Sequence, residues 1–297
     1  MRRVAYLFVI GSGRCGSTLV HRVLAGHPDV GWISSADDRL RGFSPKGRLN
    51  RRLWLAPGAT MPDFVRDRYQ PSEAYRLLAD RVSPILMTPC RDLTAADASP
   101  WLSERFARFF EERAAAQGTP VFLHKFTGWP RAGLVHAVLP EARFLHVVRD
   151  GRAVANSLLQ MPWWQGFGGP ESWTFGDLPD EYRQEWEESG RSFAVLAGLE
   201  WKVLMDAAVK AREAVPGVQW LEVRYEDLVA QPREWFLRIL EFVGLSWSDR
   251  FGLAYSSHDI RSGRSDAYQQ ELRPEDVKRL DLVLGGHLER LGYPVAG

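Results

Sequence analysis

The sequence predicts an α/β protein in which a central, mostly parallel sheet lies between two layers of helices. Two observations lead to this prediction. Short apolar runs typical of buried strands alternate with longer segments whose apolar residues recur at helical spacing. The first run, Val4 to Ile10, passes through a glycine-rich turn directly into a helical segment. Parallel strands need such crossover connections, because no tight hairpin can join them.

Composition supports a globular chain and narrows the function. The chain has 297 residues, of which 45% are hydrophobic and 25% are charged, which is enough to build a large core without disulfide bonds. The formal net charge of +1 argues against a protein that binds nucleic acid over a broad surface. No linker or internal repeat interrupts the pattern, so we expect one domain over residues 1–297, with insertions at about 34–117 and 160–190.

Cysteine usage and hydropathy bear on the setting of the protein. The two cysteines, Cys15 and Cys90, are too few for a disulfide scaffold or for a metal site built from several thiolates. No stretch approaches 18 apolar residues, so we expect no stable insertion into a membrane. The apolar N-terminal run is followed by Gly-Ser-Gly-Arg rather than by a cleavage site of small residues, which favours a strand over a signal peptide. A reducing, cytoplasmic setting is expected, and the oligomeric state is left open.

The N-terminal half contains three predicted strands, separated by helices and a long polar segment. The first strand ends at glycine, and the helix after it, from Thr18 to Ala25, stops at Gly26-His27-Pro28, where glycine and proline end helices. A second short strand is predicted at Val30 to Ile33. Residues 34–70 are rich in arginine and contain three prolines, which predicts mostly loop. Helices at about 72–82 and about 101–117 precede a third strand at Val121 to His124.

The C-terminal half continues the alternation. Pro130 to Leu139 has helical spacing with proline near its start, where proline is tolerated. Ala142 to Val148 is an apolar strand, and Val154 to Leu159 begins the next helix. A long helix is predicted at about 181–213, a strand at Val218 to Val223, and amphipathic helices at about 233–243 and about 274–291.

The most informative segment joins the first strand to the first helix and reads Gly11-Ser12-Gly13-Arg14-Cys15-Gly16-Ser17-Thr18. Glycines allow the backbone to curl so that successive N–H groups point inward, and the positive end of the helix adds to their field. Arg14 supplies a charged, forked donor. The segment therefore predicts an anion-binding loop.

The same loop differs from a nucleotide-triphosphate loop at one position. The pattern G-x-x-x-x-G-K-[ST] requires a lysine where this chain has Ser17. The strand that would supply a magnesium-binding carboxylate ends instead at Val148-Arg149, which places a cation there. We therefore expect an anion other than Mg-ATP, although a small-molecule kinase remains an alternative.

A second candidate anion site follows the strand that ends at Val148. Arg149 lies at the carboxyl end of this strand, where ligands bind in open α/β sheets. Ser157 is eight residues further on, about two helical turns along the next helix. Together with the first loop, these residues predict a ligand with two separated anionic groups.

Three segments of this chain resemble the PAPS-dependent sulfotransferases. They are Gly13 to Leu19, Phe144 to Ser157 (which contains Val147-Val148-Arg149-Asp150-Gly151-Arg152) and Val223 to Leu228. Their order and spacing also match, and the similarity extends from residue 4 to about 293. The resemblance implies the P-loop-like sulfotransferase fold, the transfer of a sulfuryl group from PAPS to an acceptor, and PAP as the product, with no metal.

The resemblance also implies roles for individual residues. Gly13, Arg14, Cys15, Gly16, Ser17 and Thr18 would hold the 5′-phosphosulfate of the donor. Arg149 and Ser157 would hold its 3′-phosphate, together with a C-terminal loop that contains Arg261, Gly263 and Arg264. The segment Tyr225-Glu226-Asp227 would organise the core or the donor pocket. Lys125, one of only five lysines, would stabilise the leaving phosphate, with Arg14 as the second catalytic cation.

The general base is left open by the sequence. Some members of the family place a glutamate soon after the first short strand, where this chain has Asp37 and Asp38. Others place a histidine two residues after the lysine, where this chain has Thr127. His124 is a further candidate, but neighbouring residues of a strand point to opposite faces, so His124 and Lys125 should diverge. Asp37 and Asp38 are preferred, with ion pairs to nearby arginines as the alternative role for each.

The acceptor is expected to be a small molecule with an apolar or aromatic part. An aromatic cluster, made up of Trp163, Trp164, Phe167, Trp173 and Phe175, lies in the insertion after the helix that contains Ser157. Such side chains can line an acceptor pocket, pin a lid or fill the core. A glycolipid, a phenol or another secondary metabolite would suit a pocket of this kind. A non-catalytic module that binds PAP or PAPS remains an alternative to the enzyme.

Overall fold

The fold is a five-stranded parallel sheet flanked by helices, and the computed structural model describes residues 4–40, 46–55, 62–260 and 265–295 of it. The strand order is β2-β3-β1-β4-β5, and every pairing is parallel. The strands are β1 (Ala5–Gly11), β2 (Val30–Trp32), β3 (Val121–Thr127), β4 (Arg143–Val148) and β5 (Trp220–Arg224). The longer helices are α1 (Ser17–Ala25), α6 (Pro100–Gln117), α8 (Gly151–Leu159), α9 (Asp180–Glu188), α10 (Phe193–Glu213), α12 (Pro232–Phe242), α13 (Asp249–Ser256) and α15 (Pro274–Arg290). The shorter ones are α2 (Ser35–Arg39), α3 (Asn50–Trp54), α4 (Asp63–Arg66), α5 (Tyr75–Arg81), α7 (Ala132–Val138), α11 (Tyr225–Ala230) and α14 (Tyr268–Glu271).

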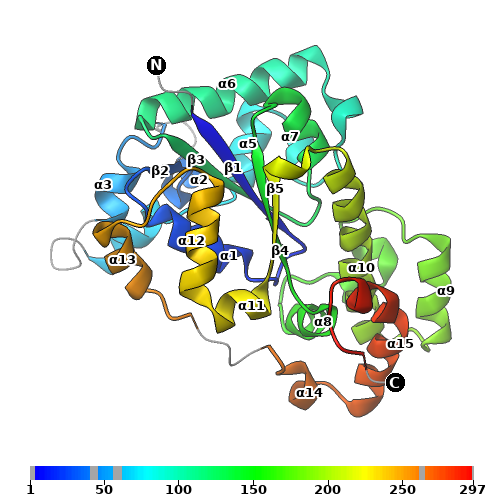
Figure 1. Cartoon of the computed structure of the whole chain (residues 1–297). Helices are drawn as coiled ribbons and strands as arrows, with labels where there is room; N and C mark the ends of the chain where they lie inside the picture. Colours follow the sequence, from blue (N-terminus) through cyan, green and yellow to red (C-terminus); the bar gives the residue numbers. More distant parts are fainter. Residues whose placement is uncertain (1–3, 41–45, 56–61, 261–264, 296–297) are drawn as a thin grey trace.

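Alternation along the strands directs side chains to two separate cores, which gives the three-layer arrangement in Figure 1. On one face, Phe8 of β1 packs against Phe106 and Phe110 of α6, with ring centroids 6.5 and 5.3 Å apart. On the other face, Val9 and its neighbours pack against α1 and α12. A third cluster joins α8, α10 and α15 around the buried Trp201. The predicted fold class is confirmed.

The strand order creates a crevice at the carboxyl end of β1. The neighbours of β1 are β3 and β4, which come much later in the chain. From β1 the chain passes into α1, which contacts β3, whereas β4 passes into α8, which packs on α10. Because the two connections diverge, the crevice opens between them, and open α/β sheets bind ligands at such a point. The glycine-rich loop and Arg149 both lie at this point.

Some predicted elements were wrong in extent. The described part of residues 34–70 is not mostly loop, because it contains α2, α3 and α4. The single helix expected at 181–213 is two helices, since Gly190 (φ 72°) and Arg191 (φ 59°) adopt a left-handed conformation through which an α-helix cannot continue. Strand β3 runs three residues beyond its expected end, to Thr127, and this extension matters for the site.

Candidate functional site

The loop between β1 and α1 is shaped as a cradle for an anion. Gly13 and Gly16 have φ values of 84° and 92°, which allow the backbone to turn back over the end of the sheet. A Cβ atom on Gly16 would lie 2.6 Å from Cε2 of Tyr225 and closer still to its Cδ2 atom, so only glycine fits there. No side chain caps the N-terminus of α1, which leaves its first N–H groups available to a ligand.

The two predicted anion sites meet at this loop. The Arg14 side chain donates a hydrogen bond from Nε to Oγ of Ser157 at 2.9 Å. The Arg149 side chain donates from Nη1 to the carbonyl oxygen of Arg14, also at 2.9 Å. The guanidinium of Arg149 lies over the ring of Tyr225, 4.8 Å from its centre. The structure therefore brings the loop, the end of β4 and helix α8 together, as a ligand with two anionic groups would require.

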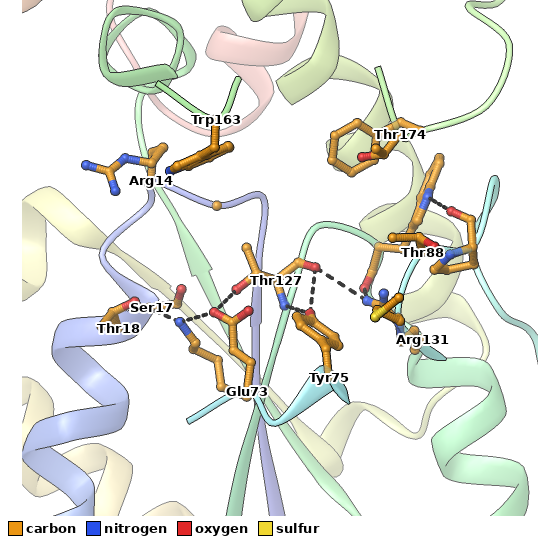
Figure 2. Close-up of a pocket in the computed structure, with 16 residues that line it drawn as sticks. Arg14, Ser17, Thr18, Glu73, Tyr75, Thr88, Thr127, Arg131, Trp163 and Thr174 are labelled. Atoms are coloured by element: carbon orange, nitrogen blue, oxygen red, sulfur yellow. Dashed lines mark hydrogen bonds and ion pairs between the residues drawn. The ribbon is translucent and has the colours of Figure 1, made fainter. Parts of the chain in front are cut away.

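Lys125, within β3, lines the same crevice as the loop between β1 and α1. Its Nζ atom donates to Oγ1 of Thr18 at 2.7 Å and forms an ion pair with Oε1 of Glu73 at 2.6 Å. The side chain of Lys125 is 5% exposed and that of Glu73 is 30% exposed, so the ion pair is partly shielded from water. Thr127, on the same face of β3 as Lys125, donates from Oγ1 to Glu73 at 2.8 Å. Figure 2 shows Thr18, Glu73 and Thr127 around one cavity, which Lys125 also lines.

Glu73 is the functional candidate that the sequence analysis missed. It stands just before α5, 52 residues upstream of Lys125, and no local motif links the two positions. Tyr75 fixes this region, because its hydroxyl donates to the carbonyl of Thr127 at 3.0 Å and accepts from the Thr127 N–H at 2.8 Å. Burial raises the pKa of Tyr75 to about 12, so this phenol stays protonated at neutral pH.

The cavity beside Lys125 and Glu73 has a volume of about 320 Å³ and a mixed lining. Its polar side contains Arg14, Ser17, Thr18, Glu73, Thr88, Lys125, Thr127, Arg131 and Thr174, and its apolar side contains Tyr75, Met87, Pro89, Trp129, Trp163 and Phe175. Arg131 is buried, and its guanidinium donates to the carbonyl of Trp129 at 2.6 Å. The cavity thus combines charged groups at the carboxyl ends of the strands with an aromatic wall (Figure 2).

The predicted bases Asp37 and Asp38 are placed as structural groups. Asp37 is buried and accepts from the Ser34 N–H and hydroxyl, at 3.0 and 2.7 Å, and from Nδ2 of Asn50 at 3.0 Å. Ser34 and Asp37 form a capping box at the start of α2, which fully explains a carboxylate at this position. Asp38 accepts from the Leu77 N–H at 2.9 Å, in the first turn of α5. Hydrogen bonds to the backbone and to neighbouring side chains thus give both carboxylates a structural role.

His124 is placed in the core, on the face of β3 opposite Lys125, as the alternation of the strand requires. Its ring lies among Phe8, Phe110 and Phe126, and neither ring nitrogen has a hydrogen-bond partner within the described residues. Burial lowers the pKa of His124 to about 3, so the imidazole is neutral. A histidine with no access to the crevice cannot serve as the base, and this candidate is corrected.

Other expected site residues are placed as follows. Tyr225 supports Arg149, and Glu226 accepts from the Asp150 N–H at 3.2 Å and from the Tyr293 hydroxyl at 2.8 Å, which fits the organising role expected for this segment. Cys15 is buried beneath the loop. Arg261, Gly263 and Arg264 lie outside the described residues.

Within the described ranges, no group of three or more His, Cys, Asp or Glu side chains could hold a metal ion. Among the same residues, no helix has the length and hydropathy needed to cross a bilayer.

Comparisons with known proteins bear on the family and the fold of this chain. A model of the sulfotransferase family matches residues 7–249. Among curated proteins, the chain is 24% identical over 251 residues to a protein-tyrosine sulfotransferase of Drosophila melanogaster and 22% identical to protein-tyrosine sulfotransferase A of Caenorhabditis elegans. These alignments cover 84% of this chain but 40% and 52% of the two relatives, so the chain spans about half the length of the curated relatives it matches.

Solved structures show the same fold. A sulfotransferase from Mycobacterium avium superposes with a TM-score of 0.57 at 15% identity, covering 98% of this chain and 78% of that one. The sulfotransferase domain of the curacin biosynthetic pathway superposes with a TM-score of 0.52 at 12% identity, and both chains are covered completely. At these identities the likeness extends to the fold alone. The family match, which covers most of the residues from β1 to α13, goes further: this chain belongs to the sulfotransferase family.

Proposed function

We propose that this chain is a PAPS-dependent sulfotransferase, which transfers a sulfuryl group to a hydroxyl or an amine of an acceptor molecule. One observation carries the proposal. Donors from the β1–α1 loop, from the end of β4 and from β3 converge on a single crevice, and a carboxylate lies among them. This arrangement can bind two anionic groups and remove a proton without a metal ion.

The residues of the crevice suit the donor. The curled loop from Gly13 to Thr18 and the uncapped start of α1 would hold the 5′-phosphosulfate. Arg149 and Ser157 would hold the 3′-phosphate, with the Tyr225 ring keeping the guanidinium of Arg149 in place. When bound, the donor supplies a sulfuryl group that is already activated for transfer.

Two groups of this chain would meet the chemical demands of the transfer. In sulfuryl transfer the acceptor oxygen bonds to sulfur as the bond from sulfur to the phosphate oxygen breaks, so the acceptor loses a proton and the phosphate gains negative charge. We assign proton removal to Glu73, which faces the cavity. Lys125 donates to the oxygen on which the charge grows, and its ion pair with Glu73 aligns both groups before the reaction.

The acceptor would enter from the aromatic side of the cavity. Tyr75, Trp129, Trp163 and Phe175 form an apolar wall beside Lys125 and Glu73. This wall favours a small-molecule, glycolipid or secondary-metabolite acceptor with an apolar or aromatic part. The curated relatives are named for protein tyrosine, which makes a peptide phenol a second acceptor class.

Binding and transfer test the proposal separately. Calorimetric titration should show that PAP binds without magnesium and that Mg-ATP binds far more weakly. Incubation with ³⁵S-labelled donor and a set of phenols, amines, glycolipids and tyrosine peptides should then label at least one acceptor. Stabilisation by Mg-ATP alone would favour the kinase alternative, and PAP binding with no transfer to any acceptor would favour a non-catalytic module.

The role of Glu73 has a sharper test. Glu73→Gln keeps the shape and a hydrogen bond to Lys125 but removes the basic carboxylate. We expect turnover to fall by about 10²–10⁴-fold while the affinity for PAP stays close to that of the wild type. Glu73→Asp, which keeps a carboxylate, should recover part of the rate. Equal rates for the wild type and Glu73→Gln would show that another group takes the proton.

A further inference from the structure

A second cavity of about 240 Å³ adjoins the first and is walled mainly by aromatic side chains. The two cavities share Gly13, Thr127, Trp163, Thr174 and Phe175. Trp163, Trp164, Trp173, Phe175 and Leu158 form its apolar walls, and Ser12, Thr127, Gln165 and Thr174 add polar groups. Among the described residues, Glu200 is the only titratable side chain that lines this cavity. A lone carboxyl in an aromatic cavity next to a catalytic site calls for an explanation.

Glu200 lies on α10 and is 4% exposed. Its Oε2 atom accepts a hydrogen bond from Nε1 of Trp164 at 2.8 Å. The Trp164 ring can lie against this region because residue 166 is glycine, where a Cβ atom would collide with the ring. Burial raises the pKa of Glu200 to about 7, and the hydrogen bond from Trp164 opposes this shift.

The charged side chains on the elements around Glu200 are engaged elsewhere. On α10, Lys202 pairs with Glu185 at 2.7 Å. On α8, Arg152 pairs with Asp150 and Asp281, each at 2.6 Å. On α15, His287 contacts Asp206 at 2.7 Å. The adjoining cavity contributes Arg14, Glu73, Lys125 and Arg131, and the interactions described above join these side chains to groups other than Glu200. Within the described residues, the structure therefore gives Glu200 no ion-pair partner.

A buried carboxyl without a cation is unfavourable for folding, and such groups concentrate at functional sites. Aromatic faces attract cations, and a carboxylate at the same place adds direct charge pairing. A ligand cation would satisfy both features of the cavity, whereas a purely apolar ligand would leave the carboxyl without a charged partner.

We propose that this second cavity binds a protonated amine, with Glu200 as its counterion and the surrounding tryptophans and Phe175 as its aromatic enclosure. The inference rests on the proposed function in that it places the cationic end of the acceptor here and the reacting group in the first cavity. It narrows the acceptor class to molecules that carry an amine next to an aromatic or apolar body.

The test compares two probes of nearly equal shape, 2-phenylethylamine and 2-phenylethanol, by calorimetry without donor. At about pH 8.5 the amine should bind at least tenfold more tightly than the alcohol. At about pH 6 only about a tenth of a carboxyl with a pKa near 7 is ionised, so the apparent affinity for the amine should fall about tenfold. Titrations in buffers of different ionisation enthalpy should show nearly one proton released on binding at about pH 6 and almost none at about pH 8.5.

Variants separate the carboxylate from the shape of the cavity. Glu200→Gln keeps the size and the acceptor for Trp164, and it should abolish both the preference for the amine and the pH dependence. Trp164→Phe removes the hydrogen bond that lowers the pKa of Glu200, so the midpoint of the pH dependence should move upward. Glu171 is an exposed carboxylate between Trp164 and Trp173 in the sequence, and it does not line the cavity. The control variant Glu171→Gln should therefore behave as the wild type.

Equal affinity for the two probes, or an amine preference that survives Glu200→Gln, would overturn the inference. PAP binding, measured on the same samples, reports on the proposed function independently. If the wild type did not bind PAP, the sulfotransferase proposal would be refuted. The affinities for the amine and the alcohol could still be compared, because they are measured without donor.

Discussion

Replacing Gly16 by alanine tests how the loop, Tyr225 and Arg149 depend on one another. The new methyl group would meet the Tyr225 ring, and the φ of 92° is unfavourable for any residue with a Cβ atom. The backbone term is about 1–2 kcal/mol. Displacing the ring would also weaken its contact with Arg149, worth about 0.5–2 kcal/mol.

The two terms predict separate readouts. Strain in the backbone should lower the free energy of unfolding by about 1–2 kcal/mol, measured by urea denaturation. Movement of Tyr225 and Arg149 should weaken PAP binding by about 0.5–2 kcal/mol, or about 2- to 30-fold in Kd, measured by calorimetry.

A matched control is available in Gly118. It has a φ of 62°, and a Cβ atom built there has no heavy atom within 4 Å. Gly118→Ala should therefore show a similar loss of stability with unchanged affinity for PAP, because it shares the backbone strain without the contact at the site. If Gly16→Ala bound PAP as tightly as the wild type, the support of Arg149 by Tyr225 would not matter for the donor, and the reasoning would fail.

Three further predictions concern single side chains. Lys125→Ala should reduce turnover about 100-fold or more and change the Kd for PAP less than about threefold, as followed by transfer of labelled sulfate; unchanged turnover would exclude Lys125 from the reaction. Burial raises the pKa of Asp92 to about 6, so the folded state holds this proton more tightly than the unfolded state does, and stability should fall as pH rises from about 4 to about 6. Asp92→Asn should remove that fall, by up to about 2 kcal/mol in urea unfolding, and identical pH slopes for both proteins would contradict the assignment. Asp38→Asn keeps an oxygen acceptor for the Leu77 N–H and should retain activity. Asp38→Ala removes this acceptor, so it should lose about 1 kcal/mol of stability and lower kcat. Equal inactivity of both variants would restore Asp38 as a candidate base.

Local patterns were sufficient to predict the sheet and the glycine-rich turn that follows β1. Strand β1 and the loop after it are formed by contiguous residues, so the apolar run and the glycines that follow it predict both elements directly. Arg149 and Ser157 were expected to face one ligand, because Arg149 follows β4 and Ser157 lies eight residues further on, in α8. In the structure both side chains are hydrogen-bonded to Arg14.

Tertiary contacts decided what the sequence left open. Glu73 meets Lys125 only because the segment before α5 folds back over β3, and no spacing rule links positions 73 and 125. The end of β3 was set too early, since Lys125 and Thr127 look polar for a buried strand until their partners are known. One available signal was overlooked: Ser34 followed three residues later by Asp37 is the pattern of a capping box, and it points to structure rather than to catalysis.

Asp37 and Asp38 help to position Glu73, which replaces them as the candidate base. Asp37 ties the start of α2 to Asn50 and so holds the segment that leaves β2. Asp38 then accepts from the first turn of α5, directly after Glu73 and Tyr75. Tyr75 is in turn hydrogen-bonded to both backbone groups of Thr127, so the chain is fixed to β3 two residues after Glu73. The acidic residues that follow β2 thus help to fix the position of Glu73, the carboxylate proposed as the base.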